Sequence, residues 1–367
     1  MKLRKIRKLF FNPGYFFRDA LIRKYPISTN QNNIKFLSEE ILIDNERNIL
    51  SGFNPHYNID IVYSWVDSND NIWKKRKEYY LESNIVKTER FSTDDARFKS
   101  HNEIYYSLLS VAQFIPWVRK IFIITDDQYP EIPNSIKDKT VIVDHRDIIP
   151  KEFLPTFNSH VIEAYLHKVP NLSENFIYFN DDFFVARPQE PSHFFRSNGL
   201  CSIFTSNKSL KIMSDVGVST ATLTASNNCN RLLQATLDTS FDKPLTHTYI
   251  PLKKSMYEKA FNLFSEEIIK FSPNKFRGKN DLNLATFLVP YLQYLCGLST
   301  PHLDISYYFN IRSPAARTFY QNLLLVKNTH NAPHSFCAND FNTHDFTGNK
   351  VYDSELVAFL EKYFVTS

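Results

Sequence analysis

An Asn-Asp-Asp run follows a short apolar stretch near the middle of the chain, at Asn180, Asp181 and Asp182. Two adjacent carboxylates repel each other unless water or a cation neutralises them. Carboxylate oxygens are hard ligands, which suit Mg²⁺ or Mn²⁺ ions that bridge to substrate phosphates. The pair therefore indicates a divalent metal site, with a helix cap or a solvated turn as the alternative.

Other residues that could act on a phosphate-bearing substrate lie on both sides of this pair. The imidazole of His247 can take a proton from an alcohol near neutral pH. Arg277 carries a fork of N–H donors for phosphate oxygens. The indole ring of Trp65 could stack on a nucleotide base, although it could equally well pack in the hydrophobic core. The carboxylates of Asp67 and Asp70 could accept hydrogen bonds from ribose hydroxyls. Single residues of these types are more often structural, but together they favour phosphoryl or glycosyl transfer from a nucleotide-sugar.

The glycine content excludes the two common glycine-built phosphate sites. The chain of 367 residues has only seven glycines, and none falls in a GxGxxG or GxxxxGK[ST] spacing. Any nucleotide site must therefore hold phosphate through a metal, an arginine or a helix N-terminus. Redox chemistry with a dinucleotide and P-loop hydrolysis both fit worse than metal-assisted transfer.

The elements that position these residues alternate in type. Short apolar segments that predict strands lie at 59–67, 121–125, 141–145 and 176–180. Helical patterns lie between them, at 102–114 and 159–168. This alternation predicts an α/β fold with a mainly parallel sheet flanked by helices, similar to Rossmann-like nucleotide-sugar transferases. Ligands of such sheets bind beyond the carboxyl ends of the strands, which is where the acids follow.

The chain divides into four predicted parts. We expect a basic amphipathic arm at 1–24 and a lead-in at 25–58. An α/β half that binds the nucleotide-sugar would follow at 59–200, and a helix-rich half that completes the active site at 201–367. The cysteines, 201, 229, 296 and 337, form no CxxC pair, which favours reduced, buried thiols. By itself, the segment 337–340 indicates only a loop.

The net charge of +4 conceals a basic N-terminal arm. Residues 1–24 carry eight basic side chains and one acid, so the remainder of the chain is mildly acidic. A nucleic-acid-binding protein would spread its basic residues over the folded surface. The arm resembles a helix for an anionic membrane surface, with a helix docked on the protein's own core as the alternative. Since this basic N-terminus lacks the apolar stretch of a secretory signal, we expect a cytoplasmic protein, peripheral on the inner face of the cell membrane.

Several longer segments resemble the conserved regions of the Stealth family, in the same order. They read IDIVYSWVDSND at 59–70, RFKSHNEIYYSLLSVAQFIPWVRKIFIITDDQYP at 97–130, VDHRDIIPKEFLPTFNSHVIEAYLHKVPNLSENFIYFNDDFFVARP at 143–188, THTYIPLKKSMYEKAF at 246–261, FRGKNDLNLATFLVPY at 276–291 and FCANDF at 336–341. The first three segments correspond to the first two conserved regions, the next two to the third, and 336–341 to the fourth. The second region is long and specific, whereas the fourth is short. Members of this family transfer sugar-1-phosphates, and they include bacterial capsule enzymes and the animal enzyme that makes the mannose-6-phosphate tag.

The resemblance implies a role for each candidate residue. Asp181 and Asp182 would hold Mg²⁺ or Mn²⁺ at the donor pyrophosphate, and His247 would be the base for the acceptor hydroxyl. Arg277 would neutralise the phosphates, and Asp340 would orient His247, a metal or the acceptor. The nucleotide pocket would be shaped by Trp65, Asp67 and Asp70. The cleft would be lined by Arg97, Glu103, Asn158, Ser159 and His160. The chain departs from the family at Phe341, where a further acidic or amide residue often follows the Asn-Asp pair.

The resemblance also implies the reaction. Hexose-1-phosphate would pass from a UDP-linked sugar to a hydroxyl of a growing capsular or cell-surface polysaccharide, which forms a phosphodiester and releases UMP. The acceptor oxygen would attack the β-phosphorus, so the anomeric carbon would keep its oxygen. One alternative is a metal-dependent glycosyltransferase that forms a glycosidic bond, and another is a non-catalytic glycan-binding scaffold.

Overall fold

The computed structural model describes residues 49–83, 101–329, 331–341 and 351–365, together with seven positions before residue 22. The predicted arm, 1–24, and the lead-in, 25–58, therefore lie mostly outside the described residues, and Arg97 lies outside them entirely. Among the described helices, none is long and apolar enough to cross a membrane.

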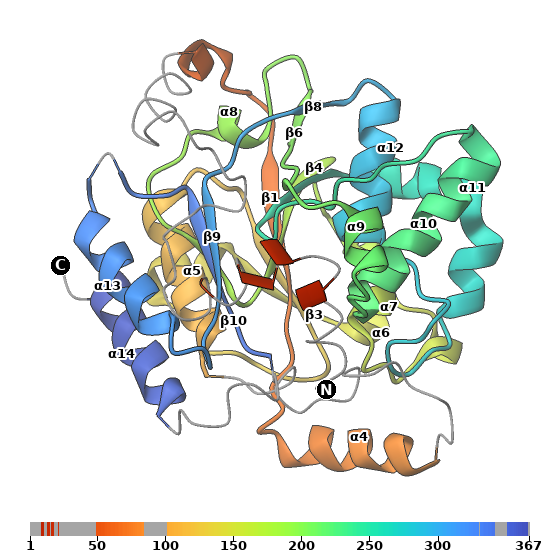
Figure 1. The fold of residues 1–367 in the computed structure, drawn as a ribbon, viewed down its shortest axis with the longest axis horizontal. Helices are drawn as coiled ribbons and strands as arrows, with labels where there is room; N and C mark the ends of the chain where they lie inside the picture. The colour runs from red at the N-terminus through yellow and green to blue at the C-terminus, as the bar shows by residue number, and fades with distance from the viewer. Residues whose placement is uncertain are drawn as a thin grey trace.

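A five-stranded sheet forms the centre of the molecule (Figure 1). Its strands are β1 (Ile59–Ser64), β2 (Ile121–Thr125), β3 (Thr140–Asp144), β4 (Asn175–Asn180) and β7 (Ile250–Lys253). They lie in the order β3-β2-β1-β4-β7, and the first four are parallel, while β7 runs antiparallel to β4. The inner strands are almost continuous runs of Ile, Val, Phe and Tyr because both faces are covered. The predicted α/β fold with a mainly parallel sheet is confirmed.

Two smaller sheets complete the strand set of the described residues. One has the order β5-β10-β9, built from Phe183–Val185, Ser335–Asn339 and Ser306–Asn310. The other pairs β6 (Cys201–Ile203) with β8 (Ser299–Pro301). The sheets tie the two halves of the chain together, because β7 pairs with β4 and β10 pairs with β5.

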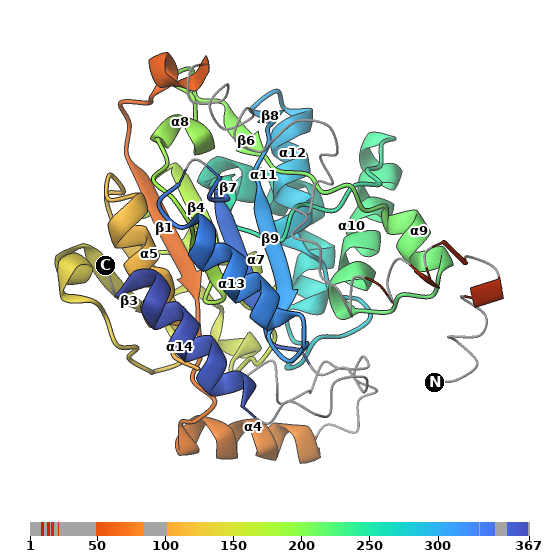
Figure 2. The same ribbon diagram turned by 60° about the vertical axis from the view of Figure 1, so that its left-hand side comes forward.

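Helices cover both faces of the central sheet (Figures 1 and 2). The helices from α4 onward are α4 Asn71–Ser83, α5 Glu103–Phe114, α6 His145–Ile148, α7 Ser159–Ala164, α8 Pro191–Phe194, α9 Leu210–Asp215, α10 Ala221–Leu237, α11 Lys254–Phe271, α12 Val289–Leu295, α13 Ala316–Val326 and α14 Tyr352–Phe364, of which α4 lies beyond one end of the sheet. Short 3-10 turns lie at Ser51–Phe53, Asn134–Lys139, Lys151–Phe153 and Leu166–Lys168, and one π-helical turn spans Leu284–Leu288.

The alternation of side chains along each strand divides the core into layers. Val62 and Tyr178 face one layer, where α7, α10, α11 and α12 pack. Tyr63 and Phe179 face the opposite layer, which α5 covers. A third cluster lies between the β5-β10-β9 sheet and helices α13 and α14. The apolar layers hold the strand ends rigidly, so the polar residues that follow each strand have fixed positions.

Candidate active site

The acidic pair occupies the turn between two sheets. β4 ends at Asn180 and β5 begins at Phe183, so Asp181 and Asp182 are the only two residues between them. In the register of the sheet, Asn180 lies beside Ser64, the last residue of β1. The pair therefore lies at the carboxyl edge of the parallel strands, as the sequence predicted, and at the junction with the smaller sheet.

Asp182 is held on one oxygen only. Its Oδ2 accepts hydrogen bonds from Asn339 Nδ2 at 2.8 Å and from Cys337 Sγ at 3.3 Å. Its Oδ1 is buried and has no hydrogen-bond partner among the described residues. A buried carboxylate oxygen without a partner costs free energy unless a ligand satisfies it. Asp182 is thus oriented by β10, with one oxygen left for a ligand.

A third carboxylate adds to the negative charge. Burial, together with the neighbouring charge of Asp182, raises the pKa of Asp181 to about 7. Burial also raises the pKa of Glu103, at the start of α5, and the charge of Asp181 acts in the same direction. Within the described part of the chain, no Lys, Arg or His side chain forms a salt bridge with any of these three acids. A divalent cation such as Mg²⁺ or Mn²⁺ fits this set, since it would neutralise the acids and satisfy the free oxygen of Asp182.

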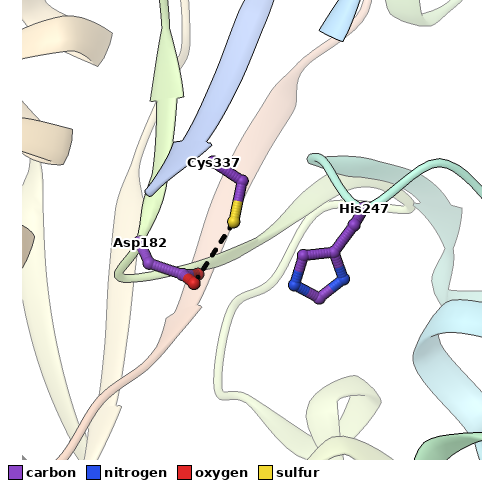
Figure 3. A group of neighbouring side chains, drawn as sticks. All are labelled: Asp182, His247 and Cys337. Atoms are coloured by element: carbon purple, nitrogen blue, oxygen red, sulfur yellow. Dashed lines mark hydrogen bonds between the residues drawn. The ribbon is translucent and has the colours of Figure 1, made fainter. Parts of the chain in front are cut away.

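His247 lies beside the pair, in the segment before β7. Its half-buried imidazole packs edge-on against Phe183 and Tyr308, with ring centroids 5.0 and 5.3 Å apart. Ligand atoms of Asp182, His247 and Cys337 all lie within 4.8 Å of one another (Figure 3). The structure therefore brings together the predicted base and Asp182, one of the two predicted metal ligands.

Cys337 and Asn339 are the contacts that sequence reasoning missed. The segment 337–340 indicated only a loop, and this prediction was wrong, because Ser335–Asn339 forms β10, paired with β5 and β9. The strand places alternate residues Cys337 and Asn339 on the face that contacts Asp182. The alternation of Ser335, Cys337 and Asn339 with apolar neighbours was the available signal.

Asp340, expected to orient His247, a metal or the acceptor, contacts other partners. It accepts two hydrogen bonds from Arg312 and one from His101 Nε2 at 3.2 Å. Although burial alone would raise its pKa, the hydrogen bonds from His101 and Arg312 lower it. The backbone N–H of His101 in turn donates to Glu103 Oε2 at 2.6 Å. Asp340 thus supports the segment that carries Glu103, and none of its hydrogen bonds in the described structure reaches His247.

Four other predicted residues gather around Asp281, which the sequence did not single out. The fully buried Asp281 accepts hydrogen bonds from Asn158 Nδ2 at 2.8 Å and His160 Nδ1 at 3.0 Å. Arg277 Nη2 donates to Ser159 Oγ at 2.5 Å, and burial lowers the pKa of this guanidinium. Asn158 also caps the N-terminus of α7. The structure therefore brings Arg277 together with the predicted cleft residues 158–160.

The residues after β1 have mainly structural surroundings. Trp65 is 8% exposed and packs in the layer under α5, which fits the core alternative. Asp70 Oδ1 accepts the backbone N–H of Ile72 at the start of α4. Gln128, which the sequence did not indicate, donates to the carbonyl of Asp67 and to Asp70 Oδ2. These bonds fix the loop between β1 and α4.

Comparisons with known proteins identify sequence relatives of this chain. The sequence model of Stealth protein CR2, conserved region 2, matches residues 97–203. A capsular polysaccharide phosphotransferase of Actinobacillus suis is 49% identical over 366 residues, which cover 98% of each chain. The capsular polysaccharide phosphotransferase LcbA of Neisseria meningitidis is 48% identical over 370 residues, covering 99% of this chain and all of LcbA. Among solved structures, the galactosyltransferase LgtC aligns with a TM-score of 0.42 at 10% identity, covering 84% of this chain and 97% of LgtC.

The identity to the two phosphotransferases extends over nearly the whole length of each chain, so it includes every element that builds the acidic edge. The chain therefore belongs to the Stealth family and is a transferase enzyme.

Proposed function

We propose that this protein transfers hexose-1-phosphate from a UDP-linked sugar to a hydroxyl of a growing capsular or cell-surface polysaccharide and releases UMP. The observation that carries the proposal is the free oxygen of Asp182 within a group of uncompensated acids, beside an imidazole. Such a site attracts a cation and, through it, a pyrophosphate. The names of the relatives support a phosphotransferase role in capsule synthesis.

His247 is the proposed general base. Its ring lies next to Asp182, and it is half-buried, so an acceptor hydroxyl can approach it. The imidazole takes the hydroxyl proton as the acceptor oxygen bonds to the β-phosphorus of the donor. The bond from that phosphorus to the UMP oxygen breaks, while the anomeric carbon keeps its oxygen. The anomeric configuration is therefore retained without a glycosyl-enzyme.

Charge builds on phosphoryl oxygens during this step. A divalent ion held by Asp181 and Asp182 would supply neutralisation of the pyrophosphate and of the departing UMP. Arg277 has a fixed position, because its guanidinium donates to Ser159 and is attracted to the buried carboxylates of Glu163 and Asp281. It is the proposed donor to the phosphate oxygens from the side of α7.

Phosphorus NMR of the reaction products tests the proposal. The purified full chain is incubated with Mg²⁺ or Mn²⁺, a panel of UDP-sugars and an acceptor oligosaccharide. We expect a phosphodiester signal in the glycan and free UMP in equal amounts. Release of UDP together with a glycosidic bond would identify the protein as a metal-dependent glycosyltransferase instead. Binding of UDP-sugar without turnover for any donor would indicate a glycan-binding scaffold.

The basic arm, residues 1–24, is the proposed membrane contact. Its eight basic side chains against one acid favour an anionic surface, such as that of the inner membrane face. Deletion of 1–24 should release the protein from anionic liposomes and leave turnover on soluble acceptors unchanged. Liposome binding that persists after the deletion would contradict this role.

A further inference from the structure

Asp182, His247 and Cys337 form a mixed set of metal-binding atoms. They come from three separate elements: the β4–β5 turn, the segment before β7, and β10. Figure 3 shows the carboxylate and the thiol in contact, with the imidazole beside them. The three ligand atoms lie within 4.8 Å of one another. One oxygen, one nitrogen and one sulfur therefore lie in one small group.

This geometry is close to that of a tetrahedral metal centre. Bonds of about 2.0–2.3 Å to Zn²⁺ place the ligand atoms roughly 3.3–3.8 Å apart. The separation of Cys337 Sγ and Asp182 Oδ2 is 3.3 Å, and the other pairs lie within 4.8 Å. Shifts of about 1 Å in the ligand atoms, through side-chain rotation, would therefore bring all three within bonding distance of one ion. Three protein ligands leave the fourth position to water, as in open zinc sites.

The chemistry of the set selects against the hard ions expected at the acidic pair. Imidazole and thiolate favour Zn²⁺ and similar borderline or soft ions, whereas Mg²⁺ requires oxygen ligands. The thiol of Cys337 is buried and donates to Asp182, so it must release its proton when a metal–sulfur bond forms. Binding of one Zn²⁺ by the three residues therefore liberates one proton.

We propose that Asp182, His247 and Cys337 form a second metal site, which takes one thiophilic divalent ion of the Zn²⁺ class and blocks the enzyme. Asp182 is shared, so this ion excludes the hard ion from its working position. His247 becomes a metal ligand, so its lone pair no longer accepts a proton. The inhibition rests on the proposed function, whereas binding of the ion stands on the geometry alone.

Cobalt provides a probe that does not depend on turnover. The full chain is stripped with a chelator and titrated with Co²⁺, and the near-ultraviolet absorption of a thiolate–Co²⁺ bond is recorded. We expect one equivalent of Co²⁺ to produce this absorption and one equivalent of Zn²⁺ to remove it. Cys337→Ser should abolish the absorption. It should weaken Zn²⁺ binding by more than about 100-fold, since loss of even an outer-shell partner costs roughly 10–100-fold in affinity.

Two further variants keep the test decisive. Cys296→Ser alters the one half-buried cysteine outside the site and should leave the cobalt absorption unchanged. His247→Ala removes a second ligand from a half-buried position and should shift the cobalt spectrum while the far-ultraviolet circular dichroism stays constant. A thiolate–Co²⁺ absorption that survives Cys337→Ser would overturn the site.

Activity separates the site from the proposed function. With Mg²⁺ present, Zn²⁺ should inhibit UMP release, and Cys337→Ser should raise the inhibitory Zn²⁺ concentration at least tenfold relative to its own zinc-free rate. Cobalt binding in a protein that releases no UMP would leave the metal site in place and reject the proposed function alone. Equal zinc sensitivity of the two proteins would reject the blocking role.

Discussion

Two aspartates, the buried Asp304 and the half-buried Asp182, contact β10 at different positions and differ in which groups compensate their charge. Asp304 is fully buried, and both its oxygens have partners. Its Oδ1 accepts from Ser335 at 2.9 Å, and its Oδ2 accepts from Tyr249 at 2.6 Å and from His193 at 3.0 Å. Asp182 keeps one oxygen without a partner in the described structure.

Protonation reflects the same difference. Burial alone would raise the pKa of Asp304, but the hydrogen bond from His193 and the nearby imidazole of His334 lower it. By contrast, burial and the charge of Asp182 raise the pKa of Asp181 to about 7. The fold thus compensates the acid that holds β10 in place and leaves the acids at the sheet edge to be compensated by a ligand.

The largest expected effect follows from Asp182→Asn. The amide keeps the shape of the side chain but removes the charge that would hold a metal. We expect the rate of UMP release to fall by about 10³-fold or more, which corresponds to roughly 4 kcal/mol of transition-state stabilisation. The melting temperature should stay the same or rise, because repulsion from Asp181 and Glu103 decreases. A lower melting temperature with full activity would mean that Asp182 stabilises the fold, as Asp304 does, and does not hold a metal needed for the reaction.

Asp304→Asn should show the opposite result. Each hydrogen bond to a buried charge contributes about 1.5–3 kcal/mol, so we expect the free energy of unfolding to fall by about 3 kcal/mol. Urea unfolding followed by circular dichroism measures this loss. The folded fraction should retain turnover within about tenfold of the wild type, since the contacts of Asp304 with the segment that carries His247 go to Tyr249 and, through Ser335, to Thr248. A loss of turnover as large as that of Asp182→Asn would place Asp304 in the reacting centre.

The comparison also explains what the sequence could predict. The strands that end in acids were visible because buried parallel strands are continuous apolar runs, and their carboxyl ends meet at one edge. The acidic pair 181–182 was therefore placed correctly at the edge of the sheet. The fold class followed from the same alternation of strands and helices.

The partners of these acids were not predictable in the same way. Cys337 and Asn339 contact Asp182, and Asp281 contacts Asn158 and His160, in each case across more than 120 residues of the chain. No local pattern encodes such pairs, because a strand's neighbours depend on how the whole chain folds. The same reason accounts for Asp340, whose contacts to His101 and Arg312 differ from the expected ones.

His145 shows that a missing hydrogen-bond partner does not by itself mark a site. It follows the edge strand β3, is 1% exposed, and neither ring nitrogen has a partner in the described structure. Burial lowers its pKa to about 4. Below about pH 6.5 the unfolded chain takes up a proton at this residue while the folded chain does not, so stability is lost as the pH falls.

This loss gives a prediction for His145→Leu. Between pH 7 and pH 5, the buried neutral His145 lowers the free energy of unfolding by about 2 kcal/mol. We expect the free energy of unfolding of the variant to decrease less between pH 7 and pH 5, by about that amount, in urea titrations at both pH values. The rate of UMP release at pH 7 should remain close to that of the wild type. An unchanged pH dependence would mean that His145 is not held neutral by burial.

The smallest effect is expected from Asn339→Ala. This variant tests whether the hydrogen bond to Oδ2 of Asp182 is needed to position Oδ1, the oxygen without a partner in the described structure. Asn339 Nδ2 orients the carboxylate at 2.8 Å, so its loss should raise the Mg²⁺ concentration for half-maximal activity by about tenfold, as for other outer-shell partners of a metal. Asn310 lies opposite Asn339 in the register of β9 and donates to the carbonyl of Phe341 instead. Asn310→Ala should therefore lower the melting temperature without changing the Mg²⁺ requirement. If both variants shift that requirement equally, then β10 as a whole, rather than the bond from Asn339, positions Asp182.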